Sequence, residues 1–255
     1  ASDVYKRQIL TGGNIDLSVG SVVCFAGAVG ATLMESKGMN PWAASIMMLL
    51  IGLLIGAWQA FWIAYVHVPP FITTLSGMLV FRGLSNVVLN GLTVSLTNAG
   101  FVKVFGGGAE CYIPDFLGGN GFNITCMLVG VIACVIYVLV QIKNRMNRAK
   151  KGYEMEALSA MVIRTVIICA VILVFMFRLA QYKGIPTALV WVALVVLIYG
   201  YITSKTTTGR YFYAVGGNEK ATKLSGINTN KVYFIAYTNM GFLAALAGML
   251  TIARM

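Results

Sequence analysis

The chain has 255 residues, of which 58% are hydrophobic and 11% are charged. A soluble domain carries about 25% charged residues, so this composition excludes an ordinary soluble domain and predicts an all-α, polytopic helical membrane protein. The net charge of +11 does not indicate a nucleic-acid partner, because the basic residues are concentrated in loops between apolar segments.

Seven apolar segments are long enough to cross a bilayer, which requires about 17 to 25 residues per helix. In chain order they are Leu17–Met34, Ala43–Val66, Phe71–Leu89, Thr125–Ile142, Val162–Ala180, Thr187–Thr203 and Val232–Ala253. We therefore expect residues 1–255 to form a single transmembrane domain of about seven spans.

Basic residues mark the cytoplasmic side of such a protein. Residues 143–151 contain five of them, and residues 204–231 contain five more against one acid, Glu219. Residues 90–123 and 181–186 contain one lysine each. Basic and non-basic loops alternate as seven spans require, so we place residues 204–231 in the cytoplasm and expect a small contribution to binding of anionic membrane lipid.

The two ends of the chain are unusual. Residues 1–8 (ASDVYKRQ) contain no Met and differ from the apolar sequence that follows, and the chain stops at Met255 directly after an apolar segment. We expect a fragment of a longer protein, with residues 1–8 as a foreign or misread start.

The segment Gly12–Asp16 interrupts the helical pattern before the first span. Two glycines and an asparagine break a helix, and Asp16 can cap the helix that follows. Irregular backbone at membrane depth is tolerated where it is buried in protein or lines a cavity. An ordinary capped helix start at the cytoplasmic surface explains the same residues, and the sequence leaves both interpretations open.

Small residues recur at every fourth position in the second span, at Gly52, Gly56 and Ala60. This spacing lets two membrane helices approach closely. We expect tight helix packing here rather than a ligand site.

Arg82 lies inside the third span, and Asn86 and Asn90 follow it at four-residue spacing, so the three share one helix face. A charge inside a membrane is costly and usually faces a bundle interior or a water-filled cavity. We favour a buried, structural or pathway-facing Arg82 over an arginine that extends toward the lipid headgroups.

The cytoplasmic segment 204–231 is longer than a simple connection needs. Gly216 and Gly217 predict a flexible turn, and Asn218 is a good N-cap for a helix outside the membrane. Glu219 then lies in the first helical turn, where the helix dipole favours an acid.

Gly226 is placed to end this two-turn helix. Ala221 and Leu224 are three residues apart, so they share one face that could press into a groove of a soluble partner. A solvated surface helix without a partner is the alternative.

The sequence contains no G-x-x-x-x-G-K-[ST] phosphate-binding loop, so any ATP must bind on another chain. One histidine and few carboxylates form no catalytic constellation. The five cysteines form no CxxC pair and no His/Cys cluster. We therefore expect a protein that is not an enzyme and that holds no metal or cofactor of its own.

Three separated motifs resemble one known family, the permease subunits of bacterial monosaccharide ABC importers, which include the ribose and xylose systems. Residues 15–21 (IDLSVGS) resemble a signature of these permeases. Gly209-Arg210 with residues 213–221 (YAVGGNEKA) and 224–227 (LSGI) resemble the cytoplasmic coupling segment of the family. Residues 61–66 (FWIAYV) and 69–84 (PPFITTLSGMLVFRGL) look most similar to the xylose and multiple-monosaccharide branch.

The resemblance implies a subunit of an ATP-driven sugar importer that works by alternating access. The implied partners are an ABC ATPase subunit, a periplasmic sugar-binding protein and a second permease subunit, as a homodimer. ATP and Mg²⁺ would be bound by the ATPase. Coupling to it would fall on Gly216, Gly217, Asn218, Glu219, Ala221 and Gly226 within residues 204–231.

Polarity and helical face single out five candidates for the translocation pathway: Asp16, Ser18, Ser21, Arg82 and Asn86. The main alternative is a secondary transporter or channel for a small polar solute, without an ATPase. Such carriers typically place several ionisable residues inside the membrane, and this chain offers Asp16 and Arg82. A non-transporting scaffold that docks a cytoplasmic protein is a third interpretation. The sequence does not identify the sugar.

Overall fold

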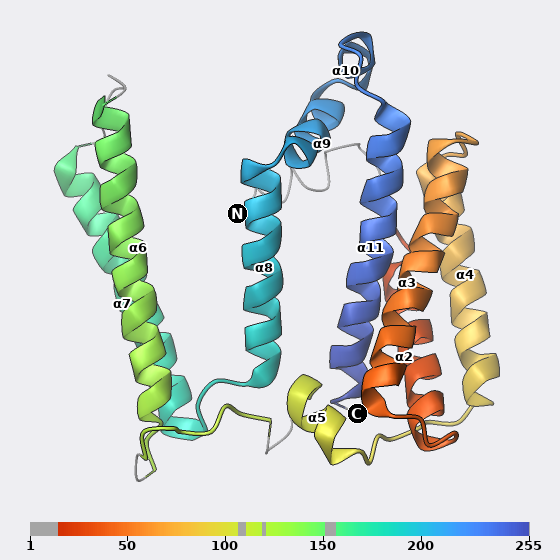
Figure 1. The fold of residues 1–255 in the computed structure, drawn as a ribbon, viewed down its shortest axis with the longest axis horizontal. Coiled ribbons are helices and arrows are strands. Elements are labelled where there is room, and N and C mark those ends of the chain that lie inside the picture. The colour runs from red at the N-terminus through yellow and green to blue at the C-terminus, as the bar shows by residue number, and fades with distance from the viewer. Residues whose placement is uncertain (1–14, 107–110, 119–120, 151–156, 255) are drawn as a thin grey trace. The chain divides into compact units, whose positions relative to one another are not determined.

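The computed structural model describes residues 15–106, 111–118, 121–150 and 157–254 (Figure 1). Within these ranges the regular structure is α-helical, apart from one isolated bridge between Tyr112 and Pro186. Six helices among the described residues are long and apolar enough to cross a membrane: α3 (Pro41–Ala64), α4 (Pro70–Leu89), α6 (Ile124–Lys150), α7 (Leu158–Tyr182), α8 (Thr187–Lys205) and α11 (Thr229–Ile252). A further apolar helix, α2 (Val19–Glu35), is shorter, with 17 residues. The polytopic all-α prediction is confirmed.

The chain folds into two compact units, one of residues 1–111 with 191–255 and the other of residues 112–190. In the first unit α2, α3, α4 and α11 pack into a bundle, and Figure 1 shows these four helices side by side. In the second unit α6 packs along α7.

Glycines bring α3 and α11 into backbone contact. A Cβ atom added at Gly241 of α11 would lie 2.2 Å from the carbonyl oxygen of Gly52, and one added at Gly56 would lie 2.8 Å from that of Tyr237. Real Cβ atoms do not approach so closely, so only glycine fits at these positions. The tight packing predicted for the Gly52, Gly56 and Ala60 face is confirmed, and its partner is α11.

A short helix that the sequence pattern did not predict, α5 (Ala99–Phe105), lies against the bundle of the first unit. Phe101 and Phe105 are buried in one apolar cluster with residues of α2, α3 and α11. Trp191 at the start of α8 stacks on Phe105, with ring centroids 5.1 Å apart, and its Nε1 donates a hydrogen bond to Val104 O at 3.1 Å. These contacts fix the end of α8 nearest to α5.

In the second unit, Asp115 fixes the start of α6. Its carboxylate accepts hydrogen bonds from the backbone N–H groups of Ile124 (3.1 Å) and Thr125 (3.3 Å) and from the Thr125 hydroxyl (2.6 Å). An acidic group at a helix N-terminus satisfies free N–H groups and interacts favourably with the helix dipole. The Asp115 carboxylate therefore ties the start of α6 to the loop that precedes it.

Candidate functional site

Two short helices occupy the segment 204–231, for which the sequence predicts a cytoplasmic position: α9 (Thr207–Gly217) and α10 (Glu219–Leu224). The two-turn helix that the sequence predicts is confirmed as α10. The prediction that Gly216 and Gly217 form a flexible turn is wrong, because both are the last helical residues of α9 and neither has a positive φ. The helical penalty of glycine, about 1 kcal/mol, is outweighed here, and the chain turns at Asn218, where φ is −159°.

Asn218 joins the two helices and caps the second. Its side-chain Oδ1 accepts a hydrogen bond from the Ala221 N–H at 3.0 Å, which is the predicted N-cap interaction. Its own N–H donates to Ala214 O at 3.0 Å at the end of α9. Glu219 follows in the first turn of α10, as predicted. One residue thus sets the angle between α9 and α10.

Gly226 ends α10 as the sequence predicts. It adopts a left-handed conformation with φ of +83°, and its N–H donates to Lys223 O at 3.1 Å while the Ile227 N–H donates to Thr222 O at 3.3 Å. This pair of bonds is a Schellman motif. Most residues with a side chain would be strained at this φ, so glycine is favoured.

Contacts with α11 hold α10 in place. The Tyr233 hydroxyl donates a hydrogen bond to Glu219 Oε2 at 3.0 Å, and Thr222 is buried. Asn228 caps the start of α11 by accepting a hydrogen bond from the Lys231 N–H at 3.0 Å. Residues 204–231 therefore form an ordered structure with a defined attachment to α11.

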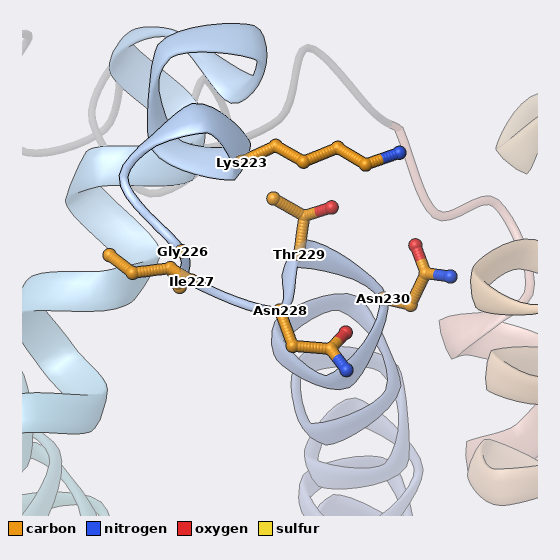
Figure 2. Close-up of a pocket in the computed structure, with 6 residues that line it drawn as sticks. All are labelled: Lys223, Gly226, Ile227, Asn228, Thr229 and Asn230. Carbon is orange, nitrogen blue, oxygen red and sulfur yellow. The ribbon is translucent and has the colours of Figure 1, made fainter.

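The turn between α10 and α11 encloses an open hollow of about 340 Å³. Figure 2 shows the residues that line it, with the Lys223 side chain extended along one side: Lys223, Gly226, Ile227, Asn228, Thr229 and Asn230. Four of the six lining residues have polar side chains, and the hollow lies next to the exposed end of α10.

The predicted apolar face of α10 is free in this chain. Leu224 is 89% exposed, and Ala221 is exposed as well. A single exposed leucine is ordinary on a protein surface, but this one stands on a helix whose two ends are both capped. Its position relative to α11 is therefore set before any partner binds.

A tight corner connects α8 to α9. A Cβ atom at Gly209 would lie 2.4 Å from Thr203 O and 2.5 Å from Ile202 O, so only glycine fits. The Thr206 hydroxyl caps α9 by accepting a hydrogen bond from the Gly209 N–H at 3.2 Å. Consequently, α8, α9, α10 and α11 follow one another through capped turns.

The second group of candidate residues lies at the start of α2. The Asp16 Oδ1 accepts hydrogen bonds from the Ser18 N–H (2.8 Å) and from the Ser18 hydroxyl (2.7 Å). Ser18 is the residue that precedes the helix and is 1% exposed, whereas Asp16 is half-buried. The expected cap by Asp16 is wrong in detail, because its carboxyl group binds Ser18 and no N–H of the helix itself. Residues 12–14 lie outside the described ranges.

A buried polar residue that the sequence analysis missed contacts Ser18. Gln59 of α3 is 3% exposed, and its Oε1 lies 3.0 Å from Ser18 Oγ. Ser21 is also buried, one turn into α2. The only sequence signal was that Gln59 is a lone amide in an otherwise apolar span. The structure thus brings Asp16, Ser18 and Gln59 together.

Arg82 and Asn86 do not join this group. Both are exposed on α4, so the expected burial of Arg82 is not found within this chain. Ser85, between them, is buried and donates a hydrogen bond to Phe81 O at 2.7 Å, within α4 itself. The four-residue spacing does place Arg82 and Asn86 on one face, and that face is left open by the bundle.

The described residues offer no site for a metal ion. No group of three or more His, Cys, Asp or Glu side chains comes together among them. The five cysteines are free thiols, three of them buried.

Comparison with known proteins places the chain among transport permeases. The family model described as "Branched-chain amino acid transport system / permease component" matches residues 8–158 and 107–255. No solved structure gives a significant match.

Three curated relatives cover nearly the whole chain. The xylose transport system permease protein XylH of Escherichia coli K12 is 34% identical over 247 residues, which are 97% of this chain and 60% of the relative. The ribose import permease protein RbsC of the same organism is 31% identical over 97% of this chain and 55% of the relative. The fructose import permease protein FruF of Bifidobacterium longum is 28% identical over 96% of this chain and 49% of the relative. The chain thus spans about half to three fifths of the length of these relatives.

Proposed function

The chain belongs to the branched-chain amino acid transport system / permease component family, and from this membership we propose that it is the membrane-spanning subunit of an ATP-driven importer. In this proposal it crosses the bacterial inner membrane several times and forms the translocation pathway. ATP binds to a separate ABC ATPase subunit, and the permease itself carries out no enzymatic reaction.

We propose a monosaccharide as the solute. The three relatives are named for xylose, ribose and fructose, which are polyhydroxylated sugars. Carboxyl, hydroxyl, amide and guanidinium groups hydrogen-bond such solutes, and the pathway candidates Asp16, Ser18, Ser21, Arg82 and Asn86 supply them. A periplasmic sugar-binding protein delivers the sugar, and a second copy of the permease completes the pathway.

The observation that carries the proposal is the construction of α10. It is capped at both ends, hydrogen-bonded to α11 through Tyr233, and presents Leu224 with 89% of its surface exposed. When a cytoplasmic partner displaces a small helix of this kind, the displacement is transmitted to the membrane helix. The hydrogen bond and the capped turn between the two helices leave them little freedom to move independently. The exposed apolar side chain suits a hydrophobic pocket on the ATPase, since anchors in such pockets supply much of the binding energy of an interface.

Co-purification tests this proposal. The complete permease is expressed with the ABC ATPase subunit of a sugar importer from the same genome and isolated in detergent. We expect the native protein to retain the ATPase and Leu224→Asp to reduce retention at least about tenfold, because a carboxylate in an apolar pocket is strongly unfavourable.

The matched control is Leu92→Asp, since Leu92 is 71% exposed in the segment expected outside the cell. It should retain the ATPase fully. If a folded native permease retains no ATPase, or if both leucine variants behave alike, the coupling role of α10 is contradicted and a carrier without an ATPase becomes the better account.

A further inference from the structure

We propose that Gln59 is a positioning residue, which holds the non-helical start of α2 and thereby the Asp16 and Ser18 side chains. Its relevance to transport rests on the proposed pathway role of these two residues. The geometric claim does not, and it can be tested without any sugar.

The non-helical residues 15–18 contact α3 and α4 about one helical turn in from the ends of these helices. Gln59 is five residues before the end of α3 at Ala64, and Thr74 is four residues after the start of α4. With a rise of 1.5 Å per residue, these positions are about 7.5 Å and about 6 Å from the respective helix ends. Both contact the segment, since Gln59 meets Ser18 and the Thr74 Oγ1, which donates to Pro70 O at 2.9 Å, also lies 3.4 Å from Ile15 O.

Non-helical backbone at this distance from the helix ends needs hydrogen-bond partners that the protein supplies. Ser18 is 1% exposed, Gln59 3% and Thr74 0%, so water does not supply them. Of the two interpretations that the sequence left open for this break, burial within the protein is observed at Ser18, whereas Asp16 and Leu17 are half-buried and Ile15 is 56% exposed. Side chains of α3 and α4 therefore determine where α2 begins.

The number of hydrogen-bond donors and acceptors at Ser18 explains why an amide side chain is suited to position 59. The Ser18 Oγ lies 2.7 Å from Asp16 Oδ1 and 3.0 Å from Gln59 Oε1, but a serine hydroxyl has one proton to donate. A half-turn of the Gln59 amide replaces its oxygen with N–H donors. Ser18 can then donate to Asp16, the stronger acceptor, while it accepts from Gln59. No apolar residue could make this contact.

Gly77 of α4 confines the amide from the other side. A Cβ atom added at Gly77 would lie 2.3 Å from the amide atom of Gln59 that points away from Ser18, and this amide atom is buried and has no hydrogen-bond partner in the described part of the chain. The Gln59 side chain is therefore held between Gly77 and Ser18. Because its amide is fully enclosed, we assign it to positioning rather than to contact with solute.

Hydrogen–deuterium exchange with mass spectrometry tests the assignment on the complete importer in lipid nanodiscs. Loss of one buried hydrogen bond should raise the local opening of the first turn of α2 about five- to tenfold. We therefore expect peptides that cover residues 15–22 to exchange faster in Gln59→Leu by this factor. Peptides from α6 and α7 serve as the internal reference for a folded protein and should not change.

Ser45→Ala is the matched control, because Ser45 is a buried polar residue of the same helix that donates to Pro41 O within α3. It should leave exchange at residues 15–22 unchanged. Equal exchange in Gln59→Leu and the native protein, or equal acceleration by Ser45→Ala, would overturn the assignment.

A double-mutant cycle tests the pair Gln59 and Gly77 directly. In the native background, Gly77→Ala should displace the amide and speed exchange at residues 15–22 by a similar factor. In a Gln59→Ala background, it should add little, because the group it displaces is absent. Additive effects would contradict the contact. Since this measurement needs no transport, its failure is distinct from failure of the importer proposal.

Discussion

The Tyr233 hydroxyl of α11 donates a hydrogen bond to Glu219 Oε2 in the first turn of α10, at 3.0 Å. This bond links the cytoplasmic helix that we assign to the ATPase contact with a helix that crosses the membrane. The two residues are 14 apart in sequence, and the turn between them is fixed by Gly226 and the Asn228 cap. The link supplies the first prediction.

Tyr233→Phe removes the hydroxyl and keeps the ring. An exposed hydrogen bond to a charged group is worth about 1 kcal/mol, so α10 should keep its fold but lose part of its attachment to α11. We expect ATPase binding within about twofold of native and sugar uptake per ATP hydrolysed reduced about two- to fivefold. The ratio of uptake to hydrolysis in proteoliposomes measures this, and an unchanged ratio would show that the bond carries no coupling.

The second prediction concerns Gly226, whose φ of +83° ends α10. Gly226→Ala places a Cβ in a left-handed conformation at a cost of about 1–2 kcal/mol, whereas Gly226→Asn should cost less, because asparagine tolerates this conformation. We expect retention of the ATPase to fall in the order glycine, asparagine, alanine. If retention of the ATPase instead follows the polarity of the side chain at position 226, the Schellman turn does not determine ATPase binding.

The third prediction separates glycines that form helix contacts from those that do not. Gly241→Ala directs a Cβ to within 2.2 Å of Gly52 O, whereas at Gly200 of α8 an added Cβ meets no atom within 4 Å. Overpacking of this kind typically costs about 1–3 kcal/mol. Gly241→Ala should lower the thermal unfolding midpoint in detergent by several degrees, and Gly200→Ala should leave it unchanged or raise it.

Arg82 supplies the fourth prediction, because it is exposed in the membrane-spanning helix α4. A charge at the centre of a membrane helix costs about 2.5–3.5 kcal/mol by insertion scales, so Arg82→Gln should reach the membrane in equal or greater amount. If Arg82 faces the pathway, sugar uptake should nevertheless fall at least about fivefold, and Arg82→Lys should retain more of it. Native uptake by Arg82→Gln would remove Arg82 from the pathway.

The features predicted most accurately from sequence are those with local causes. The N-cap at Asn218, the first-turn acid at Glu219 and the terminator at Gly226 depend on residues within one helix turn, and all three are confirmed. Six of the seven predicted spans are helices long and apolar enough to cross a membrane in the described residues, and the seventh, α2, is shorter. These helices were predictable because a membrane helix must be apolar whatever its neighbours.

Features set by distant contacts were not predictable in the same way. The short helix α5 depends on burial of Phe101 and Phe105 against other helices. Gly216 and Gly217 suggest a turn by their propensity, but the helix persists through both and ends at Asn218. Gln59 carries no local signal of its role, because its partner Ser18 is 41 residues away. The exposed position of Arg82 could not be predicted, since the apolar residues of α4 do not reveal which face packs on α2.

The central claim is that transport is driven by ATP on a partner subunit, and sugar uptake into proteoliposomes tests it most directly. The complete permease, the ATPase and the sugar-binding protein are reconstituted, and uptake of labelled xylose, ribose and fructose is measured with ATP, with a non-hydrolysable analogue, and with a proton or sodium gradient alone. The account predicts uptake of at least one sugar that requires hydrolysable ATP and is abolished by Leu224→Asp. Uptake that is driven by an ion gradient, or that proceeds without the ATPase, would contradict it.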